Sequence, residues 1–563
     1  MCVRRLALGE AALTVLFLGC CLSCSCAEFD ARSAEDSIGP PVPEPNRVAT
    51  AMVRGTVAHV GQPATDLRAP DGGGPLRVTV GQATLLALEN NQSLVVQRFD
   101  PQISRTSVQD GLSAFDPVLT AELGYQWEEM VEGATESQRE GLSAAVGVRQ
   151  FLPTGTSLGL TASASPNAMM GLAAEDEYVS RLAFDATQSL LQGLGPAVNR
   201  AAVNQARIDV KISQYELRGF AQALVAQTEQ TYWDCVAAER RIEIVTQSLD
   251  LAQRQLQETQ ERIRLGDLAP TELSAAEAEV ALRREALINA RSTLAKTRLN
   301  LLRLVNPPGA NPWTREVVLS SPPASPSVTL DDVESHVALA LRMRPDLNQA
   351  RLLYQRDDLE VVKTRNGVLP KLDLFVTLGK TGYADSFGGS IGNLDDDSYD
   401  AMVGLDFEYP PWNRGSRARQ ARAVLNRQQS REAIDNLSQL VEVDVRTAYL
   451  EIARSQEQVA ATAATRRLQE EKLRVETEKF RLGKSTSLLV GQAQRDSVAS
   501  QIEEIEAIVS HLKSFVEMYR MEGSLLERRS IAAPGQEPVR LPNTPRARIE
   551  DDHGKSIESQ IPR

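Results

Sequence analysis

The chain has 563 residues with 61 basic and 74 acidic side chains, which gives a formal net charge of −13. Proteins that bind nucleic acid normally present a clustered basic face, and only short arginine runs occur here, so we expect no nucleic-acid partner. Aromatic residues make up only 5% of the chain. Long stretches rich in Ala, Leu, Glu, Gln and Arg indicate long helices.

Residues 1–26 are typical of an export signal peptide. Arg4 and Arg5 are followed by an apolar run at 11–18 that is too short to span a bilayer as a helix. Cys20 then completes an imperfect lipoprotein box, Phe-Leu-Gly-Cys, and is the candidate lipidation site. Disulfide pairing within the same cysteine cluster remains the alternative. Residues 27–77, rich in Pro, Gly and small polar residues, predict a disordered linker.

Residues 78–305 form the first predicted unit. It opens with a helix, and beyond Pro117 apolar and polar residues alternate from Leu119 onward, which is the pattern of a half-buried strand. We therefore expect strands within 118–190, including a hairpin at Pro153-Thr154-Gly155.

A helical hairpin is predicted at 199–305. Residues 199–263 contain no proline and a single glycine, and a helix of this length would extend about 100 Å at 1.5 Å per residue. The helix ends near Gly266 and a second helix returns. Apolar residues at heptad spacing in both helices indicate an antiparallel, left-handed coiled coil.

A Pro-rich linker is expected at 306–329, and the plan restarts at 330–526. A helix leads into strands within 371–409, and a second helical hairpin at 417–526 turns at Gly483. Residues 527–563 contain five prolines and predict a disordered tail.

The two units repeat one sequence plan. Val80–Leu119 aligns with Val333–Leu372 at an offset of 253, and later positions align at an offset of 217. The tyrosine-to-glycine spacing is 34 residues in both copies, from Tyr232 and from Tyr449. The strand region of the first copy is 36 residues longer, which predicts four strands in the first unit and two in the second.

This plan resembles the TolC-like outer-membrane efflux family over roughly residues 78–526. The most specific matches are the turn sequences Arg262-Ile263-Arg264-Leu265-Gly266 and Phe480-Arg481-Leu482-Gly483. The resemblance implies a mainly α fold with a β-barrel portion: long antiparallel coiled-coil hairpins plus membrane β-strands, in two structural repeats. In that family three protomers form a 12-stranded barrel continued by a helical tunnel. The extra hairpin here would widen the barrel, form a surface loop or lie outside the membrane.

The function implied by the resemblance is an outer-membrane duct of a tripartite efflux or type I secretion system. The protein is then a homotrimer in outer-membrane lipid that extends into the periplasm. Its partners are a periplasmic adaptor and an inner-membrane pump, and no cofactor is expected. Leu265, Gly266, Leu482 and Gly483 match the adaptor-docking turns of the family, although glycine also ends helices for purely conformational reasons.

A tunnel constriction is predicted only at Glu272. The positions that carry acidic residues after the second turn of the family hold Leu489 and Gln492 here. The alternative function is a periplasmic coiled-coil scaffold or pump adaptor without a membrane barrel. An enzyme is not expected, because the four histidines are scattered without metal-ligand spacing. Cys235 is interpreted as a small buried residue.

Overall fold

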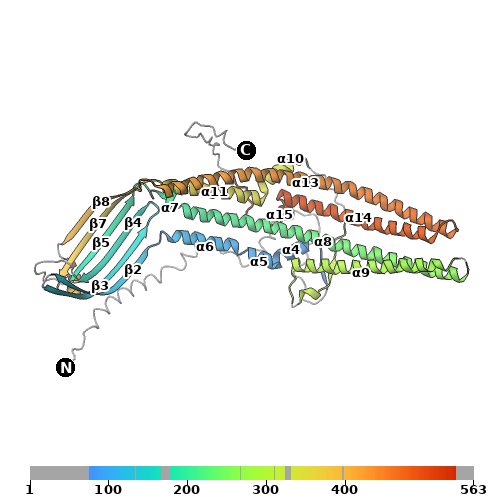
Figure 1. Ribbon diagram of the computed structural model, residues 1–563, viewed down its shortest axis with the longest axis horizontal. Coiled ribbons are helices and arrows are strands. Elements are labelled where there is room, and N and C mark those ends of the chain that lie inside the picture. Colours follow the sequence, from blue (N-terminus) through green and yellow to red (C-terminus); the bar gives the residue numbers. More distant parts are fainter. Residues whose placement is uncertain are drawn as a thin grey trace, which may run out of the picture.

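The computed structural model describes residues 75–132, 135–166, 178–266, 268–309, 311–323, 331–395 and 398–540. The predicted signal peptide, Cys20, most of the predicted linker 27–77 and residues 541–563 of the predicted tail lie outside the described residues. A β-sheet forms one end of the molecule, and long helices extend away from it to the opposite end (Figure 1). Among the described helices, none combines the length and hydropathy needed to cross a membrane.

Six strands form one antiparallel sheet in the order β2, β3, β4, β5, β7, β8, so that β2 and β8 are its edges. The first unit supplies four strands and the second supplies two, as the length difference predicted. They are β2 (Val118–Glu132), β3 (Thr135–Phe151), β4 (Thr156–Pro166), β5 (Tyr178–Ser189), β7 (Lys371–Ala384) and β8 (Tyr399–Glu408). The β7–β8 connection contains α12 (Phe387–Gly392) and η2 (Asn393–Asp395).

The sheet has one apolar face and one polar face. Directly opposed residues on neighbouring strands share a face. One such row crosses all six strands through Leu119, Val148, Leu160, Phe184, Leu378 and Ala401. The adjacent row, on the other face, contains Thr120, Gly147, Thr161, Ala183, Gly379 and Asp400. Large side chains of the apolar face are open to solvent in the single chain: Leu123 is 75% exposed and Val403 is 69% exposed.

Two helical hairpins make up the long body. The first joins α8 (Ala201–Arg264) to α9 (Thr271–Val305), and the second joins α13 (Arg414–Arg481) to α14 (Ser487–Glu522). Because α8 has 64 residues and α13 has 68, they extend about 96 and 102 Å at 1.5 Å per residue. Heptad positions of α8 such as Val245, Ala252 and Thr259 are buried. The predicted mainly α fold with two hairpin repeats is confirmed.

The helix that opens each unit is interrupted, contrary to the continuous helix expected. Asn91 leaves the helical conformation, and its side-chain oxygen accepts hydrogen bonds from the N–H groups of Ser93 (3.0 Å) and Leu94 (3.2 Å), which starts a new helix. In the second unit Pro345 begins the new helix, since proline is suited to a first turn. The pieces are α4 (Val80–Asn90), α5 (Gln92–Gln97), α6 (Asp100–Ser113), α10 (Val333–Met343) and α11 (Pro345–Asn366).

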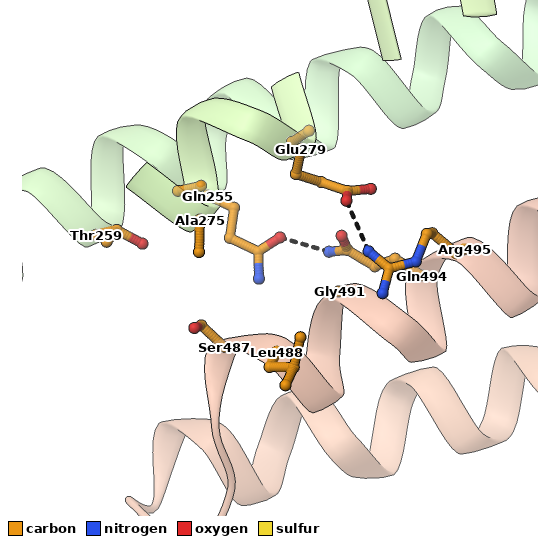
Figure 2. A pocket seen from close by; sticks show the side chains of 11 residues that line it. Gln255, Thr259, Ala275, Glu279, Ser487, Leu488, Gly491, Gln494 and Arg495 are labelled. Atoms are coloured by element: carbon orange, nitrogen blue, oxygen red, sulfur yellow. Dashed lines mark hydrogen bonds and ion pairs between the residues drawn. The ribbon is translucent and has the colours of Figure 1, made fainter. Parts of the chain in front are cut away.

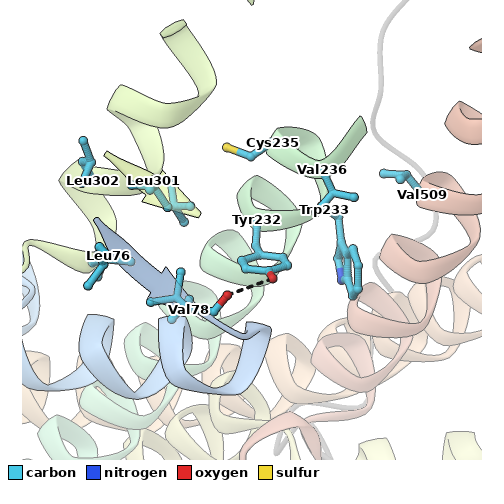
Figure 3. Close-up of a cluster of buried hydrophobic side chains, with 12 residues drawn as sticks. Leu76, Val78, Tyr232, Trp233, Cys235, Val236, Leu301, Leu302 and Val509 are labelled. Atoms are coloured by element: carbon cyan, nitrogen blue, oxygen red, sulfur yellow. Dashed lines mark hydrogen bonds between the residues drawn. The ribbon is translucent and has the colours of Figure 1, made fainter. Parts of the chain in front are cut away.

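A buried cluster holds the predicted linkers against the middle of the helical body (Figure 3). Within those linkers, β1 (Leu76–Val78) pairs in parallel with β6 (Val317–Leu319). The Tyr232 hydroxyl donates to the carbonyl of Val78 (3.1 Å) and accepts from the N–H of Ser321 (2.9 Å). Two further short elements are α7 (Pro196–Asn199), just before α8, and η1 (Pro312–Thr314), just before β6.

The expected disordered tail is wrong for residues 527–540. After α15 (Leu525–Arg528), the chain packs along α8 and α11 and buries Ile531 and Ala533. Arg529 pairs with the buried carboxylate of Glu229 at 2.7 Å. Apolar burial and a buried ion pair offset the entropy lost on ordering this segment. We call residues 529–540 the C-terminal strap.

Candidate functional site at the hairpin tips

Both hairpins turn at a glycine in the left-handed backbone region, at the end of the molecule opposite the sheet (Figure 1). Gly266 has φ +86° and Gly483 has φ +71°. L-amino acids with a Cβ pay a steric cost at such angles, so glycine is the residue that ends these helices most readily. A Cβ built at either position would meet nothing within 4 Å. The backbone conformation, rather than a lack of space, therefore favours glycine at both turns.

The turns present leucine side chains to solvent. Leu265 is 72% exposed and Leu482 is 70% exposed. On the second hairpin Leu488 and Leu489 are also exposed, whereas Val490 is buried in the hairpin seam. Isolated exposed leucines are ordinary on protein surfaces. Here, however, each turn has an exposed leucine directly before its glycine, so the two tips share the same apolar feature.

The two tips contact each other through side chains. The guanidinium of Arg262 lies over the ring of Phe480, 5.1 Å from its centroid, which is within the range of a cation–π interaction. At the start of α14, the hydroxyl of Ser487 donates a hydrogen bond to the carboxylate of Glu272 in the first turn of α9. Glu272, the predicted constriction residue, therefore lies in the seam between the hairpins.

A cleft between the hairpins lies deeper in the same seam (Figure 2). The Gln494 side chain donates to the Gln255 side-chain oxygen at 2.6 Å, and Arg495 donates to the Glu279 carboxylate at 2.8 Å. Arg283 approaches the other oxygen of Glu279 at 2.6 Å. Together with the Glu272 and Phe480 contacts, these interactions form a polar clasp, by which we mean the four cross-hairpin pairs Arg262–Phe480, Ser487–Glu272, Gln494–Gln255 and Arg495–Glu279.

One carboxyl group near the second tip has a shifted pKa. Hydrogen bonds from the Ser485 hydroxyl and the Lys479 ammonium hold the pKa of the Glu476 carboxyl below its ordinary value. Within the part of the chain that the structure describes, no group of three or more His, Cys, Asp or Glu side chains is arranged to hold a metal ion. The tip surface presents exposed leucines and charged side chains.

Cys235 lies far from the tips, within α8 and the cluster of Figure 3. Burial raises the pKa of its thiol to about 11. At neutral pH the thiol is therefore protonated, and the interpretation of Cys235 as a small buried residue is confirmed.

The structure brings Gly266, Leu265 and Glu272 of the first unit to the same end as Gly483 and Leu482 of the second. The clasp partners were not predicted, because they are more than 200 residues apart in sequence. The repeat could have indicated them, because equivalent positions of the two hairpins lie 217 residues apart. Ser487 and Glu272 are separated by 215 residues, and Arg495 and Glu279 by 216.

A protein-family model described as outer membrane efflux protein matches residues 155–306 and 337–524. The matched segments contain both helical hairpins and the strands β4, β5, β7 and β8, whereas β2 and β3 precede the first segment. No curated protein matches the sequence at a significant level.

Solved outer-membrane channels share the fold. The Campylobacter jejuni CmeC channel is 14% identical, with a TM-score of 0.59 over 80% of this chain and 89% of its own. VceC from Vibrio cholerae is 15% identical, with a TM-score of 0.58 over 79% and 96%. The open-state MtrE channel of Neisseria gonorrhoeae is 17% identical, with a TM-score of 0.59 over 84% and 97%. At these identities the likeness concerns the fold.

Proposed function

The chain belongs to the TolC-like outer membrane efflux protein family, and we propose that it is the outer-membrane duct of a tripartite efflux or type I secretion system. Three copies enclose a passive exit tunnel, with the sheets in the outer membrane and the helical hairpins in the periplasm. The single observation that carries this proposal is a two-faced sheet joined to helical hairpins whose longer helices extend about 100 Å.

The apolar face of the sheet supports contact with lipid. Its rows run through every strand, and its leucine, valine and aromatic side chains are open to solvent in the single chain. An exposed apolar surface of this extent marks an interaction site. Tyr125 and Trp127 lie toward the far end of β2, where aromatic residues favour the boundary between lipid and water.

The polar face supports a water-filled lumen. It carries Asp185, Asp373, Asp400 and Asp406, with Arg181 paired to Asp400. Backbone groups in lipid must be bonded to one another, so the sheets of several chains have to close into a barrel. A scaffold or adaptor without a membrane wall does not need this division of polarity.

A fractionation experiment tests the membrane assignment. Full-length protein, expressed with its own N-terminal segment, is expected in the outer-membrane fraction, and detergent should extract it as a trimer on native gels. Release with the soluble periplasmic proteins would favour the scaffold alternative and refute the channel.

The tips are proposed to dock a periplasmic adaptor, which in turn binds an inner-membrane pump. The paired exposed leucines at Leu265 and Leu482, next to open space at Gly266 and Gly483, support this assignment. The turn geometry alone favours glycine at both positions whether or not a partner binds, so the test must separate the two roles.

Asparagine separates them, because it tolerates the left-handed region and adds a side chain that meets nothing within the chain. The Gly266→Asn/Gly483→Asn variant should form normal trimers yet lose adaptor co-purification and export. Gly392→Asn is the matched control, since Gly392 also has open space but lies at the sheet end. Normal export by the tip variant would remove the docking proposal.

Glu272 is proposed to narrow the tunnel entrance. Its position beside Ser487 at the tips supports the proposal, because three copies would bring three carboxylates near one axis. Glu272→Ala should raise single-channel conductance and weaken block by divalent cations. Unchanged conductance and unchanged block would show that the carboxylate does not face the permeation path.

A further inference from the structure

The strands β2 and β3 extend the sheet without interrupting it. The apolar row reaches Val148 and Leu119 with no change of face, and the polar row reaches Gly147 and Thr120 in the same way. A hairpin outside a membrane wall would not need the apolar and polar faces of β4, β5, β7 and β8. These two strands therefore have the same division of faces as the four strands that match the family model.

Among the described residues, no strand pairs with the outer edge of β2 or of β8. Each edge presents a row of backbone donors and acceptors, which is costly beside lipid and is a template for pairing with another chain. On β8, Val403, Leu405 and Phe407 of the apolar face are all exposed, as are Leu119 and Leu123 on β2. Both edges thus bear the same apolar face as the rest of the wall.

A second copy of this chain fits these edges. Six strands alternate in direction, so β2 and β8 run in opposite directions. Placing β8 of one copy beside β2 of the next therefore gives an antiparallel pair, with apolar faces on one side and polar faces on the other. This head-to-tail contact keeps every helical body on the same side of the sheet. Pairing β2 with β2 would point the two helical bodies in opposite directions.

We infer that all six strands of each chain form the membrane wall and that β8 of one copy pairs with β2 of the next, so that a trimer closes as an eighteen-stranded barrel. This inference rests on the proposed function, which supplies the trimer and the membrane. The family resemblance by itself implies twelve strands.

The pore is wider as a consequence. With strands about 4.8 Å apart and tilted by about 40°, each strand occupies roughly 6.3 Å of circumference. Eighteen strands then give a backbone diameter of about 36 Å, against about 24 Å for twelve. The barrel is about 1.5-fold wider at the membrane than a twelve-stranded relative.

Cysteine cross-linking tests which strand meets the neighbouring β8. In a background with the native cysteines replaced, Thr120→Cys on β2 is combined in turn with Met402→Cys, Asp406→Cys or Glu408→Cys on β8. Several β8 positions are needed, because barrel closure staggers the strands. Thr161→Cys on β4 is the matched control, since Thr161 lies in the same polar row as Thr120.

Covalent dimers and trimers are expected with Thr120→Cys and at least one β8 partner, and none with Thr161→Cys. Cross-linking through Thr161→Cys instead would place β2 and β3 outside the ring and overturn the inference, while the membrane trimer itself would stand. An intact membrane trimer that cross-links through neither position would also overturn it. Failure of the proposed function is distinct, because no membrane trimer would form.

End-on electron microscopy of detergent-extracted trimers provides an independent readout that does not depend on the cysteine variants. The strand ring should be about 1.5-fold wider than a twelve-stranded ring. A diameter near 24 Å would overturn the eighteen-stranded closure.

Discussion

Replacing Arg529 by alanine should release the C-terminal strap. The Nε and Nη2 atoms of Arg529 each lie 2.7 Å from one carboxylate oxygen of Glu229, and that carboxylate is 1% exposed. Removing one partner of a buried pair costs about 3–5 kcal/mol, because the other charge stays buried without compensation. Arg529 is itself 37% exposed, so water can reach part of the site and the lower value of about 3 kcal/mol applies.

Hydrogen exchange measures this cost directly. The N–H of Ile531 is bonded to the carbonyl of Leu526 (2.8 Å), and the N–H of Val539 to the side chain of Asn348 (2.9 Å). These amides exchange when the strap opens. A loss of about 3 kcal/mol corresponds to roughly 150-fold faster exchange in Arg529→Ala, at 1.36 kcal/mol per factor of ten.

Two control variants isolate the buried charge as the cause. Arg240→Ala removes the exposed pair with Glu243, and surface pairs contribute about 0–1 kcal/mol, so exchange in the strap should not change. The double variant Glu229→Gln/Arg529→Met removes both charges and should recover most of the protection. Equal exchange in Arg529→Ala and the parent protein would refute the argument that this ion pair holds the strap.

Three further predictions concern Tyr232, Cys235 and Gly155. Tyr232→Phe removes two hydrogen bonds to backbone groups and should lower the free energy of unfolding, measured by heat or denaturant, by about 1–3 kcal/mol. Tyr449→Phe, at the repeat-equivalent position, should lower it less, because no hydrogen bond of the Tyr449 hydroxyl occurs among the described residues. The thiol of Cys235, with its pKa raised to about 11 by burial, should resist maleimide at pH 8 in the folded protein and react on denaturation. Gly155→Ala should prevent assembly of folded trimers on native gels, because its Cβ would meet a backbone oxygen at 2.3 Å at a φ of +90°, while Gly159→Ala, with ordinary contacts, should assemble.

The elements that could be predicted from sequence are those with a strong local period. The α8 and α13 helices follow from long proline-free heptad stretches, and β2 follows from the alternation that begins at Leu119. The turn positions Gly266 and Gly483 also follow locally, since a helix that reverses direction needs a residue suited to positive φ.

The strap and the clasp could not be predicted in this way, because their stabilisation is non-local. Residues 527–540 are rich in proline and charge, and their order depends on distant partners such as Glu229 on α8 and Asn348 on α11. Likewise β1 is too short to show a period, and its partner β6 lies about 240 residues later. The break at Asn91 was missed for a different reason: asparagine is tolerated within helices and acts as a cap only where the chain leaves the helix.

The clasp also shows that the two hairpins of one chain cannot make equivalent contacts on both sides, as a wall with sixfold symmetry would need. If three chains form the proposed ring, each hairpin has one neighbour in its own chain and one in the next. The ion pair of Arg495 with Glu279 joins the hairpins within a chain. At the repeat offset of 217 the positions equivalent to these two residues are Ala278 and Asp496, and Asp496 is already paired with Lys472 inside its own hairpin. Alanine cannot form the reciprocal ion pair, so the seam between chains must be held by other contacts. In the proposed ring the tips are therefore threefold rather than sixfold, and the within-chain and between-chain seams should respond differently to ionic strength.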